Sequence, residues 1–263
     1  MSVTYRMEGD VGIVTLARPE KFNSVSSELS RELIEAVSRG SEARALILTG
    51  EGKAFCAGAD LADLMADYET GAPDLAAVIS ERFNPMVRAL TEAPVPTIAA
   101  VNGVAAGAGL GIALACDLRV MSSQAFLLSA FIGLGLIPDT GSTWFLVHHL
   151  GLSRAIEFTA TNRRMAAEEA ENLGLARVVE PDRLIPEALA LAHTLADGPT
   201  PAYAANRKVL YGAAAVDLTT ALDAERLTQG ALGSTSLHLE GMRAFLDKRP
   251  PNFRRPDFRS ANA

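Results

Sequence analysis

Short apolar runs alternate with helix-like segments along the first half of the chain, and this order restricts the possible folds more than any other feature. The runs at 43–50, 97–103 and 116–123 are typical of buried strands because they are short and rich in apolar residues. Segments expected to be helical, at 26–39 and 107–115, occur between strands. Parallel neighbours need a crossover connection, usually a helix, so this order predicts an α/β fold with a largely parallel sheet.

The N-terminus is expected to begin with a β-hairpin. Residues 3–8 and 11–17 alternate in character and flank the dipeptide Gly9-Asp10, a two-residue turn signal. The helix expected over 26–39 has a serine available as its N-cap and a glycine just past its end. These local signals agree with an α/β chain whose first element is an antiparallel pair.

Beyond about residue 143 the pattern becomes helical. The long helix-like stretches are 184–197, 201–215 and 217–247. We therefore expect two parts, an α/β core domain over 1–195 and a helical segment over 196–263. With 263 residues, 49% of them hydrophobic, the chain can build a sizeable core without disulfide or metal support.

Charge, cysteine content and hydropathy argue against several classes of protein. The net charge is −7 and Lys and Arg are spread along the chain, which argues against nucleic acid as the main partner. Cys56 and Cys116 show no CxxC or histidine-spaced pattern, so neither a disulfide framework nor a zinc site is expected. No apolar run reaches the ~20 residues of a membrane span, and the N-terminus lacks the features of a signal peptide. We expect a cytoplasmic protein that binds neither nucleic acid, nor a membrane, nor a metal.

The stretch NGVAAGAGLGIALACD, residues 102–117, joins a strand to a helix through glycines at alternate positions, Gly107, Gly109 and Gly111. A dinucleotide-binding turn would need G-x-G-x-x-G in an early βαβ unit and an acidic residue about 20 positions on, and the spacing here differs. Backbone N–H groups at a helix start are unpaired within the helix and favour developing negative charge. Small residues would let a carbonyl group approach them, so the turn could form an oxyanion hole; close helix–strand packing is the alternative.

A second glycine-containing loop, AFCAGAD at 54–60, follows the strand expected over 43–50. The carboxyl ends of parallel strands are where ligands of α/β proteins bind. Two backbone donors, one from each loop, can therefore converge on one bound group.

Four motifs of this chain occur together in one known family. They are GKAFCAGADL, VNGVAAGAGLGIALACDLRV, GLGLIPDTGSTWFL and TNRRMAAEEAENLGLARVVE, and the resemblance that they support runs from about residue 4 to 254. The chain resembles the enoyl-CoA hydratase/isomerase (crotonase) superfamily. The resemblance implies an α/β fold of repeated ββα turns, with a C-terminal helical segment that builds homotrimers, often paired into hexamers. It also implies an acyl-CoA thioester as substrate, no permanently bound cofactor, and an enolate held by two backbone N–H groups.

By this resemblance the two N–H donors are Ala59 and Ala108, each beside a glycine. Glycine is usual at the second position in the family, so Ala108 is a departure whose methyl group could narrow the hole. The backbone of loop 57–60 is expected to hold the adenine end of CoA. The further positions assigned by the resemblance to substrate or CoA binding are Lys21, Phe22, Ala57, Gly58, Asp60, Gly107, Gly109, Phe131, Leu134, Phe245 and Lys248.

The two glutamates with which hydratases activate water and protonate the α-carbon are missing. By the same resemblance, their positions fall on Gly111 and Phe131, neither of which can act as an acid or a base. A carboxylate does occur in LIPDT, at Asp139. Because it precedes Thr140 and Gly141, it could be the N-cap of the helix that follows. By resemblance, its position matches the proton-shuttling acid of 3-enoyl/2-enoyl-CoA isomerases and of the phenylacetyl-CoA ring-epoxide isomerase, and also the aspartate nucleophile of 4-chlorobenzoyl-CoA dehalogenase.

One carboxylate without a glutamate pair fits proton transfer between two carbons. We expect isomerisation of 3-enoyl-CoA to 2-enoyl-CoA, in which Asp139 removes the α-proton, the N–H groups hold the enolate, and the same carboxyl returns the proton at the γ-carbon. The apolar neighbours Phe131, Leu134, Leu136 and Ile137 would exclude water and raise the basicity of the aspartate. Dehalogenation would also need a histidine to activate water, and none lies near in the sequence. Two other interpretations remain: an enoyl-CoA hydratase, a lyase of fatty-acid β-oxidation, and a non-catalytic acyl-CoA-binding homologue.

Overall fold

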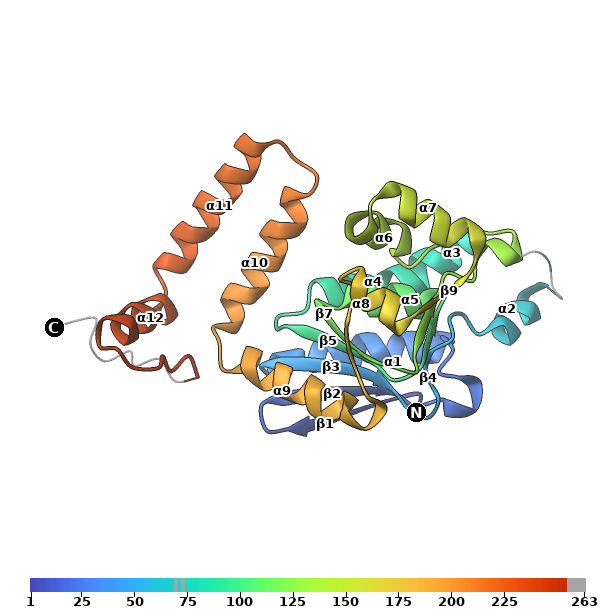
Figure 1. The fold of residues 1–263 in the computed structure, drawn as a ribbon, viewed down its shortest axis with the longest axis horizontal. Helices are drawn as coiled ribbons and strands as arrows, with labels where there is room; N and C mark the ends of the chain where they lie inside the picture. The colour runs from blue at the N-terminus through green and yellow to red at the C-terminus, as the bar shows by residue number, and fades with distance from the viewer. Residues whose placement is uncertain (69–70, 72–73, 255–263) are drawn as a thin grey trace.

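The computed structural model describes residues 1–68, 71 and 74–254, and two β-sheets with surrounding helices form its body (Figure 1). The larger sheet has six strands in the order β1-β2-β3-β5-β7-β10. Its strands are β1 (Val3–Glu8), β2 (Val11–Leu16), β3 (Ala45–Gly50), β5 (Thr97–Val101), β7 (Leu118–Ser122) and β10 (Arg177–Val179). The first two form an antiparallel hairpin, and every other neighbouring pair is parallel. The predicted hairpin and the largely parallel α/β sheet are confirmed.

A second sheet, with four strands in the order β4-β6-β8-β9, is not evident in the strand patterns of the sequence. Its strands are β4 (Ala54–Cys56), β6 (Val104–Ala106), β8 (Phe126–Leu128) and β9 (Arg164–Ala166). Each has three residues, which is too short for an alternating pattern to show. β4, β6 and β8 are parallel neighbours, and β9 runs antiparallel to β8.

Helices pack on both faces of the larger sheet. The helices of the core are α1 (Ser27–Ser38), α2 (Leu61–Tyr68), α3 (Leu75–Val78), α4 (Asn84–Thr91), α5 (Ala108–Ala115), α6 (Ser142–Leu150), α7 (Leu152–Thr161), α8 (Ala167–Asn172) and α9 (Leu184–Ala196). The short 3₁₀ turns are η1 (Pro19–Lys21), η2 (Arg39–Glu42), η4 (Ile132–Leu134) and η5 (Pro181–Arg183), and η3 (Ile79–Phe83) is a π-helical turn between α3 and α4. One apolar layer joins α1, α4 and α5 to the sheet, and a second joins α9 to its opposite face.

Two of these helices show directly how the sequence specifies them. The Ser26 hydroxyl accepts a hydrogen bond from the Leu29 N–H at 3.2 Å and so caps α1, as expected from the sequence. Every residue of α5 is buried, so this helix, apolar on all sides, lies in the middle of the core. The glycine turn that precedes α5 is therefore attached to a helix that is buried along its whole length.

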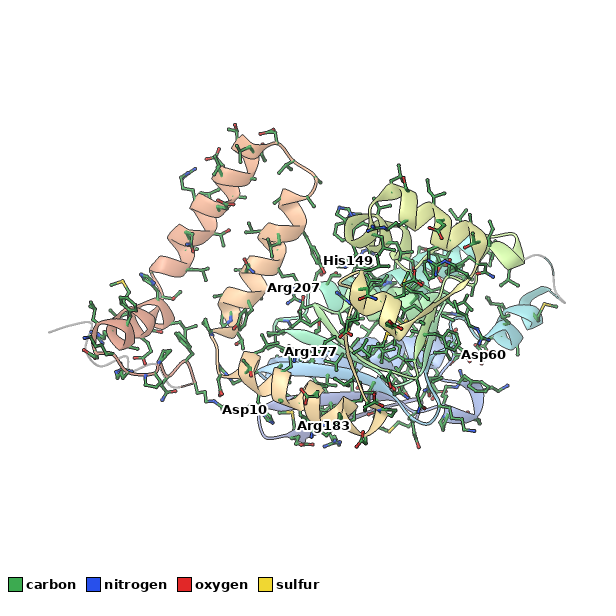
Figure 2. The ribbon with its side chains drawn as sticks, viewed as in Figure 1. Asp10, Asp60, His149, Arg177, Arg183 and Arg207 are labelled. Atoms are coloured by element: carbon green, nitrogen blue, oxygen red, sulfur yellow. The ribbon has the colours of Figure 1, made fainter. Side chains whose placement is uncertain are left out.

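Three helices extend away from this core: α10 (Thr200–Ala213), α11 (Leu218–Gly233) and α12 (Ser236–Leu246) (Figure 1). Arg207 ties α10 to the core, and Figure 2 shows it between α10 and the sheet. Its guanidinium donates to the carbonyl oxygens of Leu90 at 3.1 Å and Val95 at 3.3 Å, and it pairs with Asp117 at 3.4 Å. The expected C-terminal helical region is confirmed.

Two expectations for the second half of the chain are wrong in detail. β9 and β10 are strands within the part expected to be helical, and β10 completes the larger sheet by pairing with β7. The stretch 217–247 forms two helices because Thr235 starts a new one: its hydroxyl accepts a hydrogen bond from the His238 N–H at 3.3 Å.

Candidate active site

Three parallel strands of the smaller sheet end at the same edge, and each is followed by a segment that borders one pocket. β4 leads into 57–59, β6 into 107–108, and β8 into 129–131. The pocket has a volume of about 310 Å³. It is lined by Ala57, Gly58, Ala59, Leu61, Leu64, Leu75, Val78, Ile79, Phe83, Gly107, Ala108, Ala130, Phe131, Leu134, Leu136, Ile137, Pro138 and Asp139. The two glycine-containing loops of the sequence do converge on one cavity.

Ala59 presents a free backbone N–H in the first of these loops. The groups on either side are used: the Gly58 carbonyl accepts from the Val25 N–H at 2.7 Å, and the Asp60 N–H donates to the Val25 carbonyl at 3.0 Å. Within the residues that the structure describes, no acceptor is recorded for the Ala59 N–H itself. Gly58 has a φ of 101°, a conformation that glycine adopts without strain. The loop is thus fixed on both sides of a single unpaired donor.

Ala108 presents the corresponding N–H at the start of α5, where the helix itself offers no acceptor. Gly107, which precedes it, has φ 53° and ψ −123°, so the left-handed backbone angle falls on a glycine and Ala108 itself is helical. The two turns touch. A Cβ placed on Gly58 would lie 3.5 Å from the Ala108 nitrogen, and one placed on Gly107 would lie 3.6 Å from the Gly58 Cα. Both N–H groups therefore border the same small space, as an oxyanion hole requires.

Asp139 brings the carboxyl group to this pocket, and it is the one titratable side chain among the pocket-lining residues that the structure describes. Burial raises the pKa of Asp139 above its ordinary value, and a hydrogen bond from the Thr140 hydroxyl to Oδ1, 2.6 Å long, opposes this increase in pKa. The interpretation of Asp139 as a helix N-cap is wrong. Gly141 occupies the N-cap position of α6, and the Asp139 side chain makes no capping bond.

The positions of the two hydratase glutamates are filled in other ways. A Cβ on Gly111 would lie 2.3 Å from the Thr140 carbonyl oxygen and 3.0 Å from the Ser142 hydroxyl, so this backbone leaves no room for a longer side chain there. Phe131 lines the pocket and is largely buried, and its ring carbon Cζ would lie 3.9 Å from a Cβ on Gly107. The backbone of Thr140 therefore fills the space beside position 111, and an aromatic ring stands at position 131.

Several binding residues expected from the sequence do not line the pocket. Asp60 is mostly buried against Arg18, 2.9 Å away, and its other oxygen accepts from the Ala62 N–H at the start of α2. Figure 2 shows Asp60 near the base of α2. Gly109 instead permits close packing, because a Cβ there would lie 2.1 Å from the Cys56 carbonyl oxygen. The side chain of Asp60 and the position of Gly109 thus support the loops rather than face the cavity.

The remaining expected CoA contacts divide into two groups. Lys21 and Phe22 have exposed side chains. They lie beside the first loop, since the Phe22 carbonyl accepts a hydrogen bond from the Ala57 N–H at 3.0 Å. Phe245 and Lys248 lie on or just after α12, at the opposite end of the molecule from α2 (Figure 1). Within one chain, these last two do not border the pocket.

Sequence reasoning missed most of the apolar wall of the pocket. The wall comes from α2, α3 and the π-helical turn η3, a feature that is frequent at functional sites. Its side chains are Leu61, Leu64, Leu75, Val78, Ile79 and Phe83. The one available signal was the spacing of Leu61 and Leu64, which places two leucines on one helical face directly after the AGAD loop.

The described residues contain neither a candidate metal site nor a membrane-spanning helix. Across 1–68, 71 and 74–254, there is no group of three or more His, Cys, Asp or Glu side chains placed to hold a metal ion. Over the same residues, no helix has both the length and the apolar character needed to cross a bilayer.

Comparison with known proteins agrees with this site. Residues 6–256 match the family model described as "Enoyl-CoA hydratase/isomerase". A protein of Escherichia coli named "1,2-epoxyphenylacetyl-CoA isomerase" is 40% identical over 251 residues, which cover 94% of this chain and 96% of that protein. A protein of Rhodobacter capsulatus named "Probable enoyl-CoA hydratase" is 38% identical over 254 residues, covering 96% of this chain and 97% of the relative.

Solved structures give the same result for the fold. The crystal structure of an enoyl-CoA hydratase from Polaromonas sp. JS666 superposes with a TM-score of 0.90 at 34% identity, covering 96% of this chain and 99% of that one. The family match spans nearly the whole chain, and the smaller sheet, its glycine turns and the C-terminal helices are all present. The chain therefore belongs to the enoyl-CoA hydratase/isomerase (crotonase) superfamily, whose enzymes act on CoA thioesters without a permanently bound cofactor.

Proposed function

We propose that this enzyme isomerises 3-enoyl-CoA to 2-enoyl-CoA, with Asp139 as its single proton shuttle. The observation that carries the proposal is the chemistry of the pocket: among its described lining residues, Asp139 is the one side chain that can accept or donate a proton. Moving a double bond by one carbon requires that one proton leave the α-carbon and one return at the γ-carbon. A single carboxyl group that reaches both carbons is sufficient for this.

The proposed mechanism assigns a role to each part of the site. The thioester oxygen accepts hydrogen bonds from the Ala59 and Ala108 N–H groups, and the Asp139 carboxylate removes the α-proton. The electron pair of that C–H bond passes into a dienolate whose negative oxygen remains in the hole. Protonation of the γ-carbon by the same carboxyl then gives the 2-enoyl thioester. Each donor of such a hole contributes roughly 2.7–4 kcal/mol to stabilisation of the transition state.

Hydration is the alternative, and the names of several relatives support it. It normally requires two carboxylates, one to activate water and one to protonate the α-carbon. Here Gly111 and Phe131 stand at those positions, and Thr140 fills the space beside Gly111. The pocket wall is also apolar, which disfavours a bound water molecule. These observations favour isomerisation over hydration.

The wild-type enzyme provides the first test. We expect incubation with short- and medium-chain 3-enoyl-CoA to produce the conjugated thioester absorbance of 2-enoyl-CoA. With 2-enoyl-CoA as substrate, we expect no loss of that absorbance to a 3-hydroxyacyl product. Hydration without isomerisation would support the alternative, and binding of CoA esters with neither reaction would identify a non-catalytic homologue.

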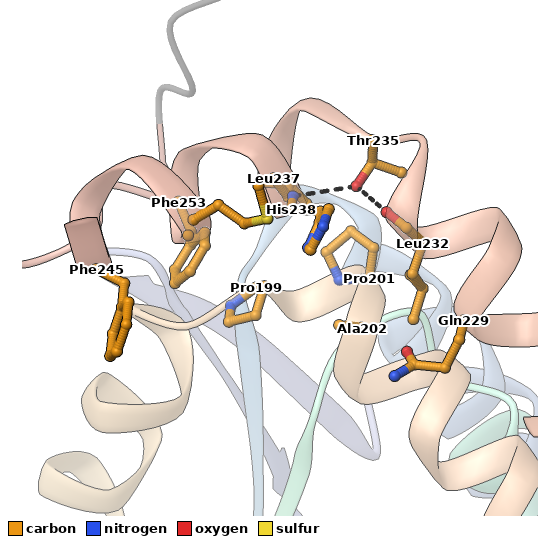
Figure 3. A pocket seen from close by; sticks show the side chains of 12 residues that line it. Pro199, Pro201, Ala202, Gln229, Leu232, Thr235, Leu237, His238, Phe245 and Phe253 are labelled. Atoms are coloured by element: carbon orange, nitrogen blue, oxygen red, sulfur yellow. Dashed lines mark hydrogen bonds between the residues drawn. The ribbon is translucent and has the colours of Figure 1, made fainter.

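We also propose a homotrimer or a dimer of trimers, with 1–195 as the core domain and 196–263 as the segment that joins the copies. The C-terminal helices expose many apolar side chains in a single chain, and such patches mark interaction surfaces. They are Leu210, Leu218, Leu222, Leu227, Met242, Phe245 and Leu246, and Val216 in the connection between α10 and α11 is exposed as well. α12 also borders a second cavity of about 440 Å³, lined by Pro199, Leu232 and Phe245 among others (Figure 3).

This assembly would explain the position of Phe245 and Lys248. Phe245 is 83% exposed and is not among the residues that line the pocket of its own chain. If these residues contact CoA, they do so at the pocket of a neighbouring copy. The proposal includes the setting expected from the sequence, a cytoplasmic enzyme of fatty-acid metabolism.

Charges on α11 are expected to break this assembly. Leu222→Asp with Leu227→Asp should shift the protein from three or six chains toward one, because two exposed leucines of α11 become charged. Size-exclusion chromatography with light scattering measures the mass. Met7→Asp, which adds a charge at an exposed apolar residue of β1, is the matched control and should leave the mass unchanged. A wild-type protein that elutes as a single chain would contradict the proposal.

A further inference from the structure

Thr140 adopts a backbone conformation that its side chain disfavours. It has a φ of 53° and is followed by Gly141 with a φ of 74°. The Ser142 N–H closes this turn on the Asp139 carbonyl at 2.9 Å. Two consecutive residues of positive φ define a type I′ turn, in which glycine, asparagine or aspartate is the usual residue. Among the described non-glycine residues with positive φ, Thr140 is the only β-branched one, and such a residue is a genuine outlier.

The strain at Thr140 coincides with a specific contact to the reacting group. Its hydroxyl donates to Oδ1 of Asp139 at 2.6 Å, and its side chain is almost fully buried, with 1% exposure. In the described part of the chain, no other side chain is recorded as hydrogen-bonded to that carboxyl group. Glycine would fit the turn without strain but would leave the carboxyl group without this donor. Backbone strain retained at a site is often part of its mechanism.

The bond has a direct consequence for a base in an apolar pocket. A carboxylate there is disfavoured by burial, and a donor pointed at one oxygen stabilises the charged form. It also limits rotation of the carboxyl group, which leaves Oδ2 as the oxygen free to meet the substrate. Both effects are required if one carboxyl is to take a proton at one carbon and return it at another.

We propose that Thr140 is the positioning residue of the reaction: its hydroxyl orients the Asp139 carboxyl group toward the bound thioester and keeps it available as a base. This inference rests on the proposed function of Asp139. Thr140 is not among the residues that line the pocket and packs against Gly111, so we assign it a positioning role and no contact with the substrate. The residue with the disfavoured backbone angle is thus the one that supplies the hydroxyl group to Asp139.

Three substitutions separate this role from a packing role. Thr140→Val keeps the shape, the branching and the strain but removes the donor. Thr140→Ser keeps the donor. Thr140→Gly removes both the strain and the donor. A packing role predicts that valine is the mildest of the three, whereas the positioning role predicts that serine is.

We expect Thr140→Val to lower kcat for isomerisation roughly 10- to 100-fold, the range for loss of a hydrogen bond to a charged group, with a smaller change in KM. The acid limb of the kcat/KM profile should move to higher pH, because burial then raises the pKa of Asp139 unopposed. Thr140→Ser should restore most of the rate and the original profile. Thr140→Gly should show the same shifted profile, and because it relieves the disfavoured backbone angle, it gives the test a second variant if the valine one does not fold.

The controls distinguish the two proposals. Thr49→Val removes a buried hydroxyl that donates to the Ala100 carbonyl at 2.8 Å in the larger sheet, away from the pocket, and should leave the pH profile unchanged. If Asp139→Asn is inactive while Thr140→Val and Thr140→Gly keep the wild-type rate and profile, Thr140 has no positioning role and the function of Asp139 stands. If Asp139→Asn is fully active, the proposed function itself is wrong.

Discussion

Replacing Asp139 by asparagine should reduce isomerisation by about 10²- to 10⁴-fold, the contribution typical of a positioned acid–base group. The amide has nearly the same shape as the carboxyl group but cannot accept the α-proton. The Ala59 and Ala108 N–H groups and the apolar wall remain in place, so the CoA ester should still bind with nearly the wild-type affinity.

The measurement compares the rate of 2-enoyl-CoA formation with the dissociation constant of a saturated acyl-CoA. Asp182→Asn, at an exposed position in η5, makes the same chemical change away from the pocket and should leave both quantities unchanged. An Asp139→Asn enzyme with the wild-type rate would show that the base lies elsewhere. Equal losses of rate and of binding would point to a structural role for this carboxyl group.

Gly107→Ala should lower kcat/KM by about 10²- to 10³-fold, as expected for loss of one donor of an oxyanion hole. The cause is conformational rather than steric. A Cβ at this position would meet nothing closer than 3.6 Å, but φ 53° with ψ −123° is accessible only to glycine. An alanine must relax to another conformation, and that rotation moves the adjacent Ala108 N–H out of the hole.

Gly174→Ala is the matched control for this prediction. Gly174 also has a positive φ, 73°, and a Cβ there meets nothing within 4 Å, so the substitution likewise places an alanine at a backbone angle that favours glycine. Because Gly174 does not line the pocket, its alanine variant should lose some thermal stability but keep full activity. Equal activity of the two variants would argue that the Ala108 N–H is not a donor to the thioester oxygen.

The sequence specifies the larger sheet better than the smaller one. β3 and β5 lie within apolar runs that can be recognised locally, and the helices of the second half have lengths that reveal them. β4, β6 and β8 have three residues each, and their existence depends on pairing with segments 22 to 50 positions away. No local sequence pattern can reveal a strand whose existence depends on such distant pairing. The family motifs nevertheless marked their ends, because the glycines that follow β4 and β6 are visible in the sequence.

The residues of the site divide in the same way into those marked by sequence motifs and those brought together only by folding. Ala59, Ala108 and Asp139 were predicted from motifs, and the structure places all three at one pocket, while their roles remain proposals. The apolar wall from α3 and η3 was missed because its side chains converge only after the chain folds. The significance of Thr140 was also hidden, since a threonine next to an aspartate gives no sign of a left-handed backbone angle.

The packing of Gly111 against Thr140 also limits how this enzyme could be converted, by evolution or by design. A glutamate at 111 cannot be added to the present site, because the Thr140 carbonyl oxygen lies 2.3 Å from where its Cβ would be. Making room requires moving the same turn that holds Asp139. The hydratase acid at 111 and the aspartate at 139 are therefore mutually exclusive on this backbone. If the proposed function holds, a path from shifting a double bond to adding water must pass through a rebuilt 139–142 turn, rather than through a single substitution.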